Sequence, residues 1–543
     1  MPLFGRKRIF GPRPELQPAG EAAPWLWAVA GGVGMAAAFP PLPLGPLALV
    51  ALAPLLRLLR RPALSLYGDA GRWFRVGLVF ALVYHGIQFR WVYFTFHTQG
   101  GQPLVLVLGL YGLWVLLVSL PWGALFALCR WAWVRAGWHP APLLALGWAL
   151  LDALLARHPF GGVGWASPAV TQVFGLGAYY VAPVLGGAGV VALVVMTNAL
   201  WAGCLTGRRG GLGGRIPPLA LAAGLSIVLS LPAAMLEPTP AWTAGGTPFP
   251  VLVVPGRQPV QTETLPSAGE EHAAAARSMR AFLGDTLTAL EEPLTTDGAT
   301  PALIVWPEYA VAGPMRPDVE LRDLGNLSAL VEADLLVGAQ TRSPAEMPPG
   351  TLLNSAYLVQ GDGTHLRYDK RGLVPLGEYR PALLRWLMPG KLTAGGTDYT
   401  PGTGPVILPW ARAHLGMAIC SESMQGGHMP LLARSGAEVM VALANDAWLP
   451  PWAAWQHLRL TALRGLEVGR DVLWAVNGGP SALLRPGTAP GPLHGAAPAG
   501  GKPFIARPTP RAGLTPLTRW GGWTVLLLAP PLLLLALLGR LRP

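Results

Sequence analysis

The chain has 543 residues, of which 52% are hydrophobic, and a mean hydropathy of +0.41. It is too long for one ordinary domain and more apolar than soluble proteins usually are, so the composition indicates a membrane protein. The net charge of +12 does not indicate nucleic-acid binding, because the Lys and Arg clusters sit at the ends of apolar segments and form no basic, aromatic-interleaved stripe. Charged residues are scarce before about residue 237 and after about 521, which predicts a soluble-type domain between membrane spans.

Apolar segments near the length needed to cross a bilayer dominate both ends of the chain. Eight spans are predicted, at 23–39, 44–59, 74–95, 103–128, 140–156, 182–204, 216–235 and Trp523–Gly539. Basic clusters fall at alternate ends of these segments: RKR at 6–8, RLLRR at 57–61, Arg130 with Arg135, RR at 208–209 and RLR at 540–542. The positive-inside rule makes these ends cytoplasmic. The sequence therefore predicts three parts: a membrane domain at 1–236, an outer domain at 237–518, and a last span with a cytoplasmic tail at 519–543.

Polar side chains inside the predicted spans are costly and need partners. His85, Gln88 and Arg90 lie in the third span. Asp152 and Arg157, near the fifth, fit a structural ion pair or interfacial snorkelling as well as a substrate role, so we assign no catalysis to them. Two of the three cysteines, Cys129 and Cys204, lie at span ends and are expected to be small buried hydrophobes.

The middle of the chain alternates short β-branched strands with helices, which is typical of an α/β layered domain. The strands are expected at 250–254, 302–306, 333–338, 355–359, 413–420, 438–443 and 472–476, and the helices at 268–292 and 453–469. The Gly, Pro and Ala rich stretch at 485–518 is expected to be a linker. No dinucleotide, P-loop or zinc motif occurs in the sequence, so neither a cofactor nor a metal is predicted.

Three motifs in this domain carry chemistry. IVWPEYA places Glu308 after an apolar strand, where a carboxylate could act as a general base. YDKRGLVPLGEY holds Lys370, which could stabilise a thiolate and later an oxyanion, and Glu378. LGMAICSES ends an apolar strand in Cys420, the sequence form of a strand-to-turn nucleophile, with Glu422 just beyond it.

Each of these residues also has an ordinary explanation when it is taken alone. Cys420 could be a buried core residue, and Glu308 and Lys370 could be surface charges. Glu378 and Glu422 could support the site or simply be solvated. The chemical interpretation depends on the motifs occurring together.

Taken together, the motifs resemble the nitrilase superfamily, whose members use Glu, Lys and Cys in that chain order. WPE, KRGLVPLGEY and the strand into Cys420, followed by NDAW, QH, LEVGR and NGGPSAL, are similar to the apolipoprotein N-acyltransferase family. The frame of several spans, an external domain and a final span is also similar. The resemblance implies an α-helical transmembrane bundle joined to an α/β nitrilase-like αββα sandwich.

The resemblance also implies an activity. Members of the family take an acyl chain from a phospholipid, typically phosphatidylethanolamine, and hold it as a thioester on the cysteine. They then pass it to the α-amino group of the diacylglyceryl-cysteine that begins a bacterial apolipoprotein. By that resemblance, Cys420 is the nucleophile, Glu308 the general base and Lys370 the stabiliser of the tetrahedral intermediate, while Glu378 and Glu422 support the site. The expected location is the bacterial cytoplasmic (inner) membrane, with the catalytic domain on the outer, periplasmic face.

The sequence departs from the family pattern in several places. Ser421 follows the nucleophile where tyrosine is usual, VVPGRQP replaces a VQGN-like stretch, HPFGGVGW stands where FPW is expected, and Asp152 replaces a glutamate. These changes bear on lipid specificity more than on the chemistry. A membrane-tethered amidase or hydrolase using the same three residues is the alternative, and a non-catalytic lipid-binding protein is a third. The Trp and Pro rich segment from Leu449 to Trp455 is either a mobile lid or a packed loop.

Overall fold

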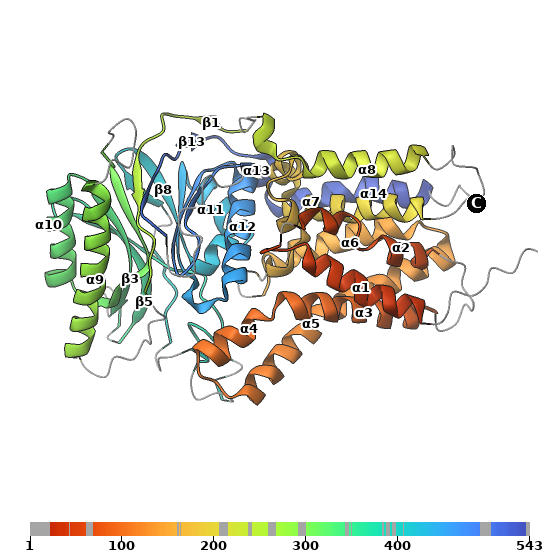
Figure 1. Ribbon diagram of the computed structural model, residues 1–543, viewed down its shortest axis with the longest axis horizontal. Coiled ribbons are helices and arrows are strands. Elements are labelled where there is room, and N and C mark those ends of the chain that lie inside the picture. Colours follow the sequence, from red (N-terminus) through yellow and green to blue (C-terminus); the bar gives the residue numbers. More distant parts are fainter. Residues whose placement is uncertain are drawn as a thin grey trace, which may run out of the picture.

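A computed structural model places a helical bundle beside an α/β body (Figure 1). It describes residues 22–42, 44–60, 69–159, 162, 164–205, 216–236, 242–258, 268–291, 300–342, 347–348, 350–382, 385–386, 391–393, 398–404, 407–488 and 501–538. The expected domain boundary at residue 237 lies outside these ranges, and residue 519 falls within a helix.

The bundle contains the helices from both ends of the chain. They are α1 (Ala23–Ala37), α2 (Ala53–Leu59), α3 (Asp69–Gln88), α5 (Leu104–Ala136), α6 (Pro140–Leu155), α7 (Leu176–Cys204), α8 (Ile216–Ser230), α13 (Pro516–Trp520), η11 (Gly521–Leu528) and α14 (Ala529–Leu538). In the described part of the chain, three helices are long and apolar enough to cross a membrane: Leu104–Ala136, Leu176–Cys204 and Pro516–Leu538. Four further apolar helices of 10–17 residues lie at Ala23–Ala37, Gly45–Leu59, Pro140–Leu155 and Leu219–Ser230. The long helices agree with a membrane protein, whereas the prediction of eight spans is not confirmed.

Prolines divide one predicted span into two short helices, and a glycine breaks another that is still long enough to cross a membrane. The second segment contains Pro46 and Pro54, and it divides into the short helix η1 (Gly45–Leu49) and α2. The helix α7 is broken at Gly186, whose φ of 70° and ψ of −172° are not helical. The broken turn leaves the N–H of Gly187 without a helical partner, and the carboxylate of Glu467 from the α/β body accepts it at 2.7 Å.

The α/β body has two sheets between two layers of helices. One sheet has the order β12-β2-β3-β4-β5-β6 and the other the order β11-β10-β9-β8-β7. Helices α9 (Ala268–Glu291) and α10 (Arg322–Val331) cover the first sheet, and α11 (His428–Arg434) and α12 (Pro451–Val468) cover the second (Figure 1). The strands are β2 (Val251–Val253), β3 (Leu303–Met315), β4 (Asp334–Arg342), β5 (Leu352–Val359), β6 (His365–Asp369), β7 (Ile407–Trp410), β8 (Ala413–Ile419), β9 (Val439–Asn445), β10 (Val472–Asn477), β11 (Ala482–Leu484) and β12 (Phe504–Ala506). This is the expected αββα sandwich.

The strands that the sequence predicts correctly include the parallel central ones, β2–β3–β4 and β8–β9–β10. They are buried on both faces, so they are nearly continuous apolar runs and are easy to recognise. The strands β6, β7, β11 and β12 were missed because they are short or flank the central strands in antiparallel pairs. The expectation of a linker at 485–518 is wrong in part: β12 pairs with β2, and β13 (Arg511–Ala512) pairs with β1 (Ala244–Gly245).

The layer formed by α11 and α12 faces the bundle, with α12 packed on α7 and α11 on α13 (Figure 1). Hydrogen bonds also cross this junction. Gln456 donates to the carbonyl of Trp165 at 2.7 Å, and the Gly426 N–H donates to the carbonyl of Ala156 at 2.8 Å. A second contact comes from the π-helix η2 (Phe94–Gln99), which follows α4 (Trp91–Tyr93) and donates hydrogen bonds to the loop before α12. The bundle therefore holds the α/β body at two places.

The segment from Leu449 to Trp455 runs directly into this junction. Its residues from Pro451 onward form the first turn of α12. The guanidinium of Arg90 lies 3.6 Å from the centre of the Trp452 ring, a cation–π contact. In this structure the segment packs against the bundle through this contact, and its movement as a lid stays a prediction.

We expect Glu467→Ala to destabilise the whole chain. Glu467 accepts from the Gly187 N–H at 2.7 Å and pairs with Arg464 at 2.6 Å, and both side chains are buried. Removing the carboxylate leaves a buried cation uncompensated, so the free energy of unfolding should fall by about 3–5 kcal/mol. Denaturant unfolding of the full chain in detergent, followed by tryptophan fluorescence, measures this change.

Glu467→Gln is the matched control, because its amide oxygen can still accept the Gly187 N–H while the charge is lost. It should lose less stability than Glu467→Ala. An Ala variant as stable as the wild type would show that this junction contributes nothing to the fold.

Candidate active site

The predicted nucleophile lies in a strained turn. Cys420 comes directly after β8 and begins the short 3-10 helix η9 (Cys420–Met424). Its φ is 51°, in the left-handed region that residues with a Cβ rarely occupy. Such a conformation persists only where the surroundings hold it, and it is common at reactive sites. The sequence prediction of a strand-to-turn position for Cys420 is therefore confirmed.

Glu308 lies on a bulge of β3. The strand was expected to end near Pro307. It continues instead to Met315, with two register shifts against β4. Proline cannot donate to the ladder, which is why the extended strand is irregular here. Gly338 on β4 permits the close approach, since a Cβ there would lie 2.5 Å from the Pro307 carbonyl oxygen.

The Glu308 carboxylate is buried, with 3% of the residue exposed. It accepts a hydrogen bond from the side-chain amide of Asn354 at 2.8 Å. Burial raises the pKa of Glu308 to about 7, although the Lys370 ammonium and the Asn354 amide act in the opposite direction. A carboxyl with such a pKa can both take and return a proton near neutral pH.

Lys370 follows β6 and is 1% exposed. Its Nζ lies 2.8 Å from the Glu378 carboxylate. Burial alone would lower the pKa of Lys370, but Glu378, Cys420 and Glu308 outweigh burial and raise it. The side chain therefore stays a cation. The Glu378 carboxylate also accepts from the Val374 N–H at 2.7 Å and from the Asn354 amide at 3.0 Å, so it is fixed on three sides.

The structure brings Glu308, Lys370 and Glu378 to one place with the thiol. Burial raises the pKa of the Cys420 thiol well above its ordinary range, and Glu308 raises it further, while Lys370 lowers it. The resting cysteine is thus a neutral thiol that needs a base when it reacts. One base, one cation and one nucleophile can together perform acyl transfer.

Glu422 has a different place from that of the other carboxylates. It is fully buried and accepts the N–H groups of Ile419 (2.8 Å), Arg371 (2.7 Å) and Gly372 (2.9 Å). The Tyr368 hydroxyl lies 2.8 and 2.9 Å from its two oxygens. Glu422 therefore ties the end of β8 to the loop that begins at Lys370, and so fixes Cys420 relative to Lys370.

Ser421, which stands where tyrosine was expected, makes a second tie between the same two loops. Its hydroxyl donates to the carbonyl of Gly372 at 3.1 Å.

Two sets of residues at the site were not assigned a role from the sequence. Asn354, near the start of β5, donates to both Glu308 and Glu378, and an asparagine inside the apolar run TLLNSAYLV could have indicated it. Asp446 and His457 lie behind Cys420. They belong to the NDAW and QH motifs, so their presence was noted but their contact was not foreseen.

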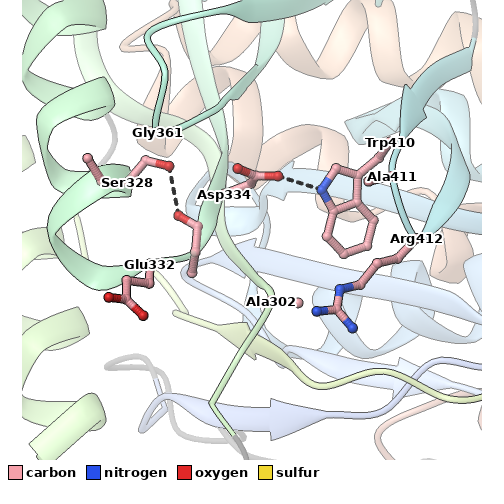
Figure 2. Close-up of a pocket in the computed structure, with 10 residues that line it drawn as sticks. Ala302, Ser328, Glu332, Asp334, Gly361, Trp410, Ala411 and Arg412 are labelled. Carbon is pink, nitrogen blue, oxygen red and sulfur yellow. Dashed lines mark hydrogen bonds between the residues drawn. The ribbon is translucent and has the colours of Figure 1, made fainter.

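A surface cavity of about 350 Å³ lies elsewhere, between the end of α10 and the hairpin of β7 and β8. Figure 2 shows the Asp334 carboxylate there, accepting from the Trp410 indole N–H at 2.7 Å. The cavity lies where β3 and β4 begin, and its lining includes none of the residues that surround the thiol. In open α/β sheets, ligands bind beyond the carboxyl ends of the strands, where Cys420 lies. This cavity is therefore separate from the candidate site around Cys420.

Known proteins share both parts of the chain. The family model "Apolipoprotein N-acyltransferase N-terminal domain" matches residues 31–200, and "Carbon-nitrogen hydrolase" matches residues 278–486. An apolipoprotein N-acyltransferase from Geobacter metallireducens is 29% identical over 479 residues, or 85% of each chain. One from Azotobacter vinelandii is 29% identical over 530 residues, or 95% of each chain. A CN-hydrolase superfamily protein from Xanthomonas campestris aligns with a TM-score of 0.33 and 16% identity, over 49% of this chain and 91% of that one.

We expect Glu422→Gln to lower the free energy of unfolding by about 2–3 kcal/mol. Three backbone N–H groups converge on the two carboxylate oxygens, so an amide NH₂ must face at least one of these donors in either orientation. Denaturant unfolding in detergent measures the loss. Tyr368→Phe, which removes one donor and leaves the three N–H contacts, should lose about 1 kcal/mol. Equal losses in the two variants would contradict a special role for the carboxylate.

Proposed function

This chain belongs to the apolipoprotein N-acyltransferase family and is an acyltransferase, and from that premise we propose how its residues carry out the reaction. It moves an acyl chain from a phospholipid to the α-amino group of the diacylglyceryl-cysteine of an apolipoprotein. Cys420 carries the chain between the two substrates as a thioester. The observation that carries this proposal is the strained, half-buried Cys420 beside a base, Glu308, and a buried cation, Lys370.

In the first half-reaction, Glu308 takes the thiol proton as the Cys420 sulfur attacks the carbonyl carbon of a phospholipid ester. The negative charge that develops on the former carbonyl oxygen is stabilised by the Lys370 ammonium. The ester C–O bond then breaks, Glu308 gives its proton to the departing alkoxide, and a lysophospholipid leaves. The acyl chain remains on Cys420 as a thioester.

In the second half-reaction, the α-amine of the acceptor attacks the thioester carbonyl and Glu308 takes the amine proton. Lys370 stabilises the second oxyanion as it did the first. The C–S bond breaks, an amide remains on the acceptor, and the proton returns from Glu308 to the thiolate. Each step conserves protons, so Glu308 is ready for the next cycle.

Glu378 acts on this chemistry through Lys370, which it contacts at 2.8 Å. Its negative charge offsets the loss of hydration of the buried ammonium and holds Nζ in one place. A cation that is already fixed needs no reorganisation when the oxyanion forms. Glu378 is therefore a positioning residue.

The membrane arrangement extends the same proposal. Residues 1–236 and 519–543 lie in or across the bacterial inner membrane, with both termini cytoplasmic, and 237–518 face the periplasm. The alternating basic clusters support this orientation. Phosphatidylethanolamine is the proposed donor. Both substrates are lipids, so a catalytic domain held against membrane helices need not draw either one fully into water.

We expect Cys420→Ala to abolish acyl transfer, because it removes the sulfur that forms the thioester. Wild type in membranes, given a phospholipid with a labelled acyl chain and a diacylated lipopeptide, should gain a hydroxylamine-sensitive acyl group at Cys420 and yield triacylated lipopeptide. The Ala variant should do neither, with a rate reduced about 10³-fold or more. Mass spectrometry follows the label on the enzyme and on the lipopeptide.

Cys420→Ser is the control for the shape of the turn, since it keeps a small polar group there and should give only a trace of oxygen ester. Label found solely as free fatty acid would make the protein a hydrolase. Full activity of the Ala variant would refute Cys420 as the nucleophile.

The rate of Cys420 acylation should fall as the pH drops through about 7. The pKa of Glu308 is raised to about 7 by burial, so its carboxyl gains a proton below that pH and can no longer act as a base. Single-turnover acylation measured between about pH 5.5 and 8.5 tests this sign.

Asn354→Ala is the matched variant for this pH profile, because it removes a hydrogen-bond donor that lowers the pKa of Glu308. Its acid limb should move to higher pH than that of the wild type. An acid limb near the ordinary pKa of glutamate, unmoved by Asn354→Ala, would contradict Glu308 as the base.

A further inference from the structure

A chain of buried polar groups lies behind the nucleophile. The Ser423 hydroxyl is 3.1 Å from Nε2 of His457, and Nδ1 of the same ring is 2.8 Å from the Asp446 carboxylate. The Thr461 hydroxyl is 2.9 Å from that of Ser423. None of these residues is more than 1% exposed, so none can meet a substrate in this structure.

Burying several polar groups together is unfavourable unless each finds a partner. The imidazole is enclosed by aromatic rings, with the centre of Trp474 at 4.7 Å and that of Trp165 at 6.5 Å. One oxygen of Asp446 is committed to the ring, and the other, Oδ2, has no hydrogen-bond partner among the described residues. Apolar side chains would fill this space without the cost of burying polar groups, so the presence of these polar groups indicates a function.

These buried side chains hold the carbonyl group of Cys420. Ser423 donates to that oxygen at 2.8 Å, and Nε2 of His457 lies 3.3 Å from it. Because φ of Cys420 is 51°, the residue would relax toward an ordinary conformation if its peptide group were free to turn. Glu422 fixes the N–H of Ile419 on the other side, so the strained residue is held at both ends.

We infer that His457, oriented by Asp446, is a positioning residue for the nucleophile. With Nδ1–H donated to the carboxylate, the ring cannot turn, and Nε2 faces Ser423 and the Cys420 carbonyl. In the charged ring Nε2–H donates to the Cys420 carbonyl while the Ser423 hydroxyl keeps its own bond to the same oxygen. In the neutral ring Nε2 can only accept, so the single Ser423 proton goes either to Nε2 or to the carbonyl. His457 therefore holds the Cys420 peptide group directly when charged, and holds Ser423 beside that group when neutral. This role rests on the proposed function, in which Cys420 carries the acyl chain.

The experiment compares His457→Phe, His457→Gln and Asp446→Asn with Trp474→Phe, in full-length protein in detergent. Phenylalanine fills the ring volume without a polar atom, whereas glutamine can place an N–H near the position of Nε2. Trp474→Phe disturbs packing against the same ring but removes no hydrogen bond, since the Trp474 indole N–H has no partner in the described residues. It is therefore the matched packing control.

Three quantities are measured for each variant: the single-turnover rate of Cys420 acylation, the KM for the phospholipid, and the midpoint of thermal unfolding. We expect His457→Phe to slow acylation by about 10–100-fold, the effect of one or two lost hydrogen bonds, with an unchanged KM. Asp446→Asn should slow it about tenfold. His457→Gln should recover most of the rate, and Trp474→Phe should lower only the thermal midpoint.

Alkylation of Cys420 by N-ethylmaleimide, followed at the peptide level by mass spectrometry, gives a readout that needs no lipid. Its rate should fall with the acylation rate in His457→Phe. Equal slowing of acylation in His457→Phe and Trp474→Phe, or loss of thermal stability with an unchanged rate, would overturn the inference. A wild-type protein that never gains an acyl group would instead refute the proposed function. The alkylation rates of the variants would still test the positioning role of His457.

Discussion

The site depends on one buried cation. Lys370 is almost fully enclosed, and an ammonium group in that position must have compensating negative charge. Glu378 supplies it at 2.8 Å and Glu308 lies close enough to act on the same charge. Two carboxyls face one lysine, and Glu378 holds the direct contact. The Glu308 carboxyl is also buried but is attracted to the Lys370 ammonium less strongly, so burial dominates and the pKa of Glu308 rises to about 7. The pairing of Lys370 with Glu378 thus affects both the pKa of the proposed base and the position of the proposed oxyanion stabiliser.

Lys370, Glu378 and Glu308 can act on Cys420 only if it stays beside them, and buried hydrogen bonds hold it there. Glu422 joins the end of β8 to the loop that starts at Lys370, so hydrogen bonds connect the segments that carry the thiol and the cation. From the other side, α12 carries His457 against the Cys420 carbonyl and, farther along, Glu467 against the broken helix α7. A single helix therefore connects the nucleophile turn to the membrane bundle. The bundle is part of the framework that orients the catalytic domain.

The sequence predicted much of the fold because the central strands are buried on both faces and lack polar interruptions. The helices at 268–292 and 453–469 were predicted within a residue or two, since their apolar spacing is regular. The edge strands were missed, because their residues are mixed in character and their pairing is set by partners far along the chain. The eight-span prediction rested on the lengths of apolar segments and the placement of basic clusters, and neither gives the length of the continuous helix, which Pro46 and Pro54 shorten in the second segment.

The sequence by itself pointed to the groups that the proposed reaction uses. Glu308 follows the apolar run IVW and a proline, Lys370 precedes a Gly/Pro loop, and Cys420 ends an apolar strand, and each of these patterns is a local property of the chain. What only the tertiary structure decided is how those groups act on one another. The pKa of Glu308, the strained φ of Cys420, and the separate roles of Glu378 and Glu422 all come from contacts between segments distant in sequence. The same holds for Asn354 between the two carboxylates and for His457 behind the nucleophile. Burial and hydrogen-bond geometry depend on which segments meet, and no pattern within one segment contains that information.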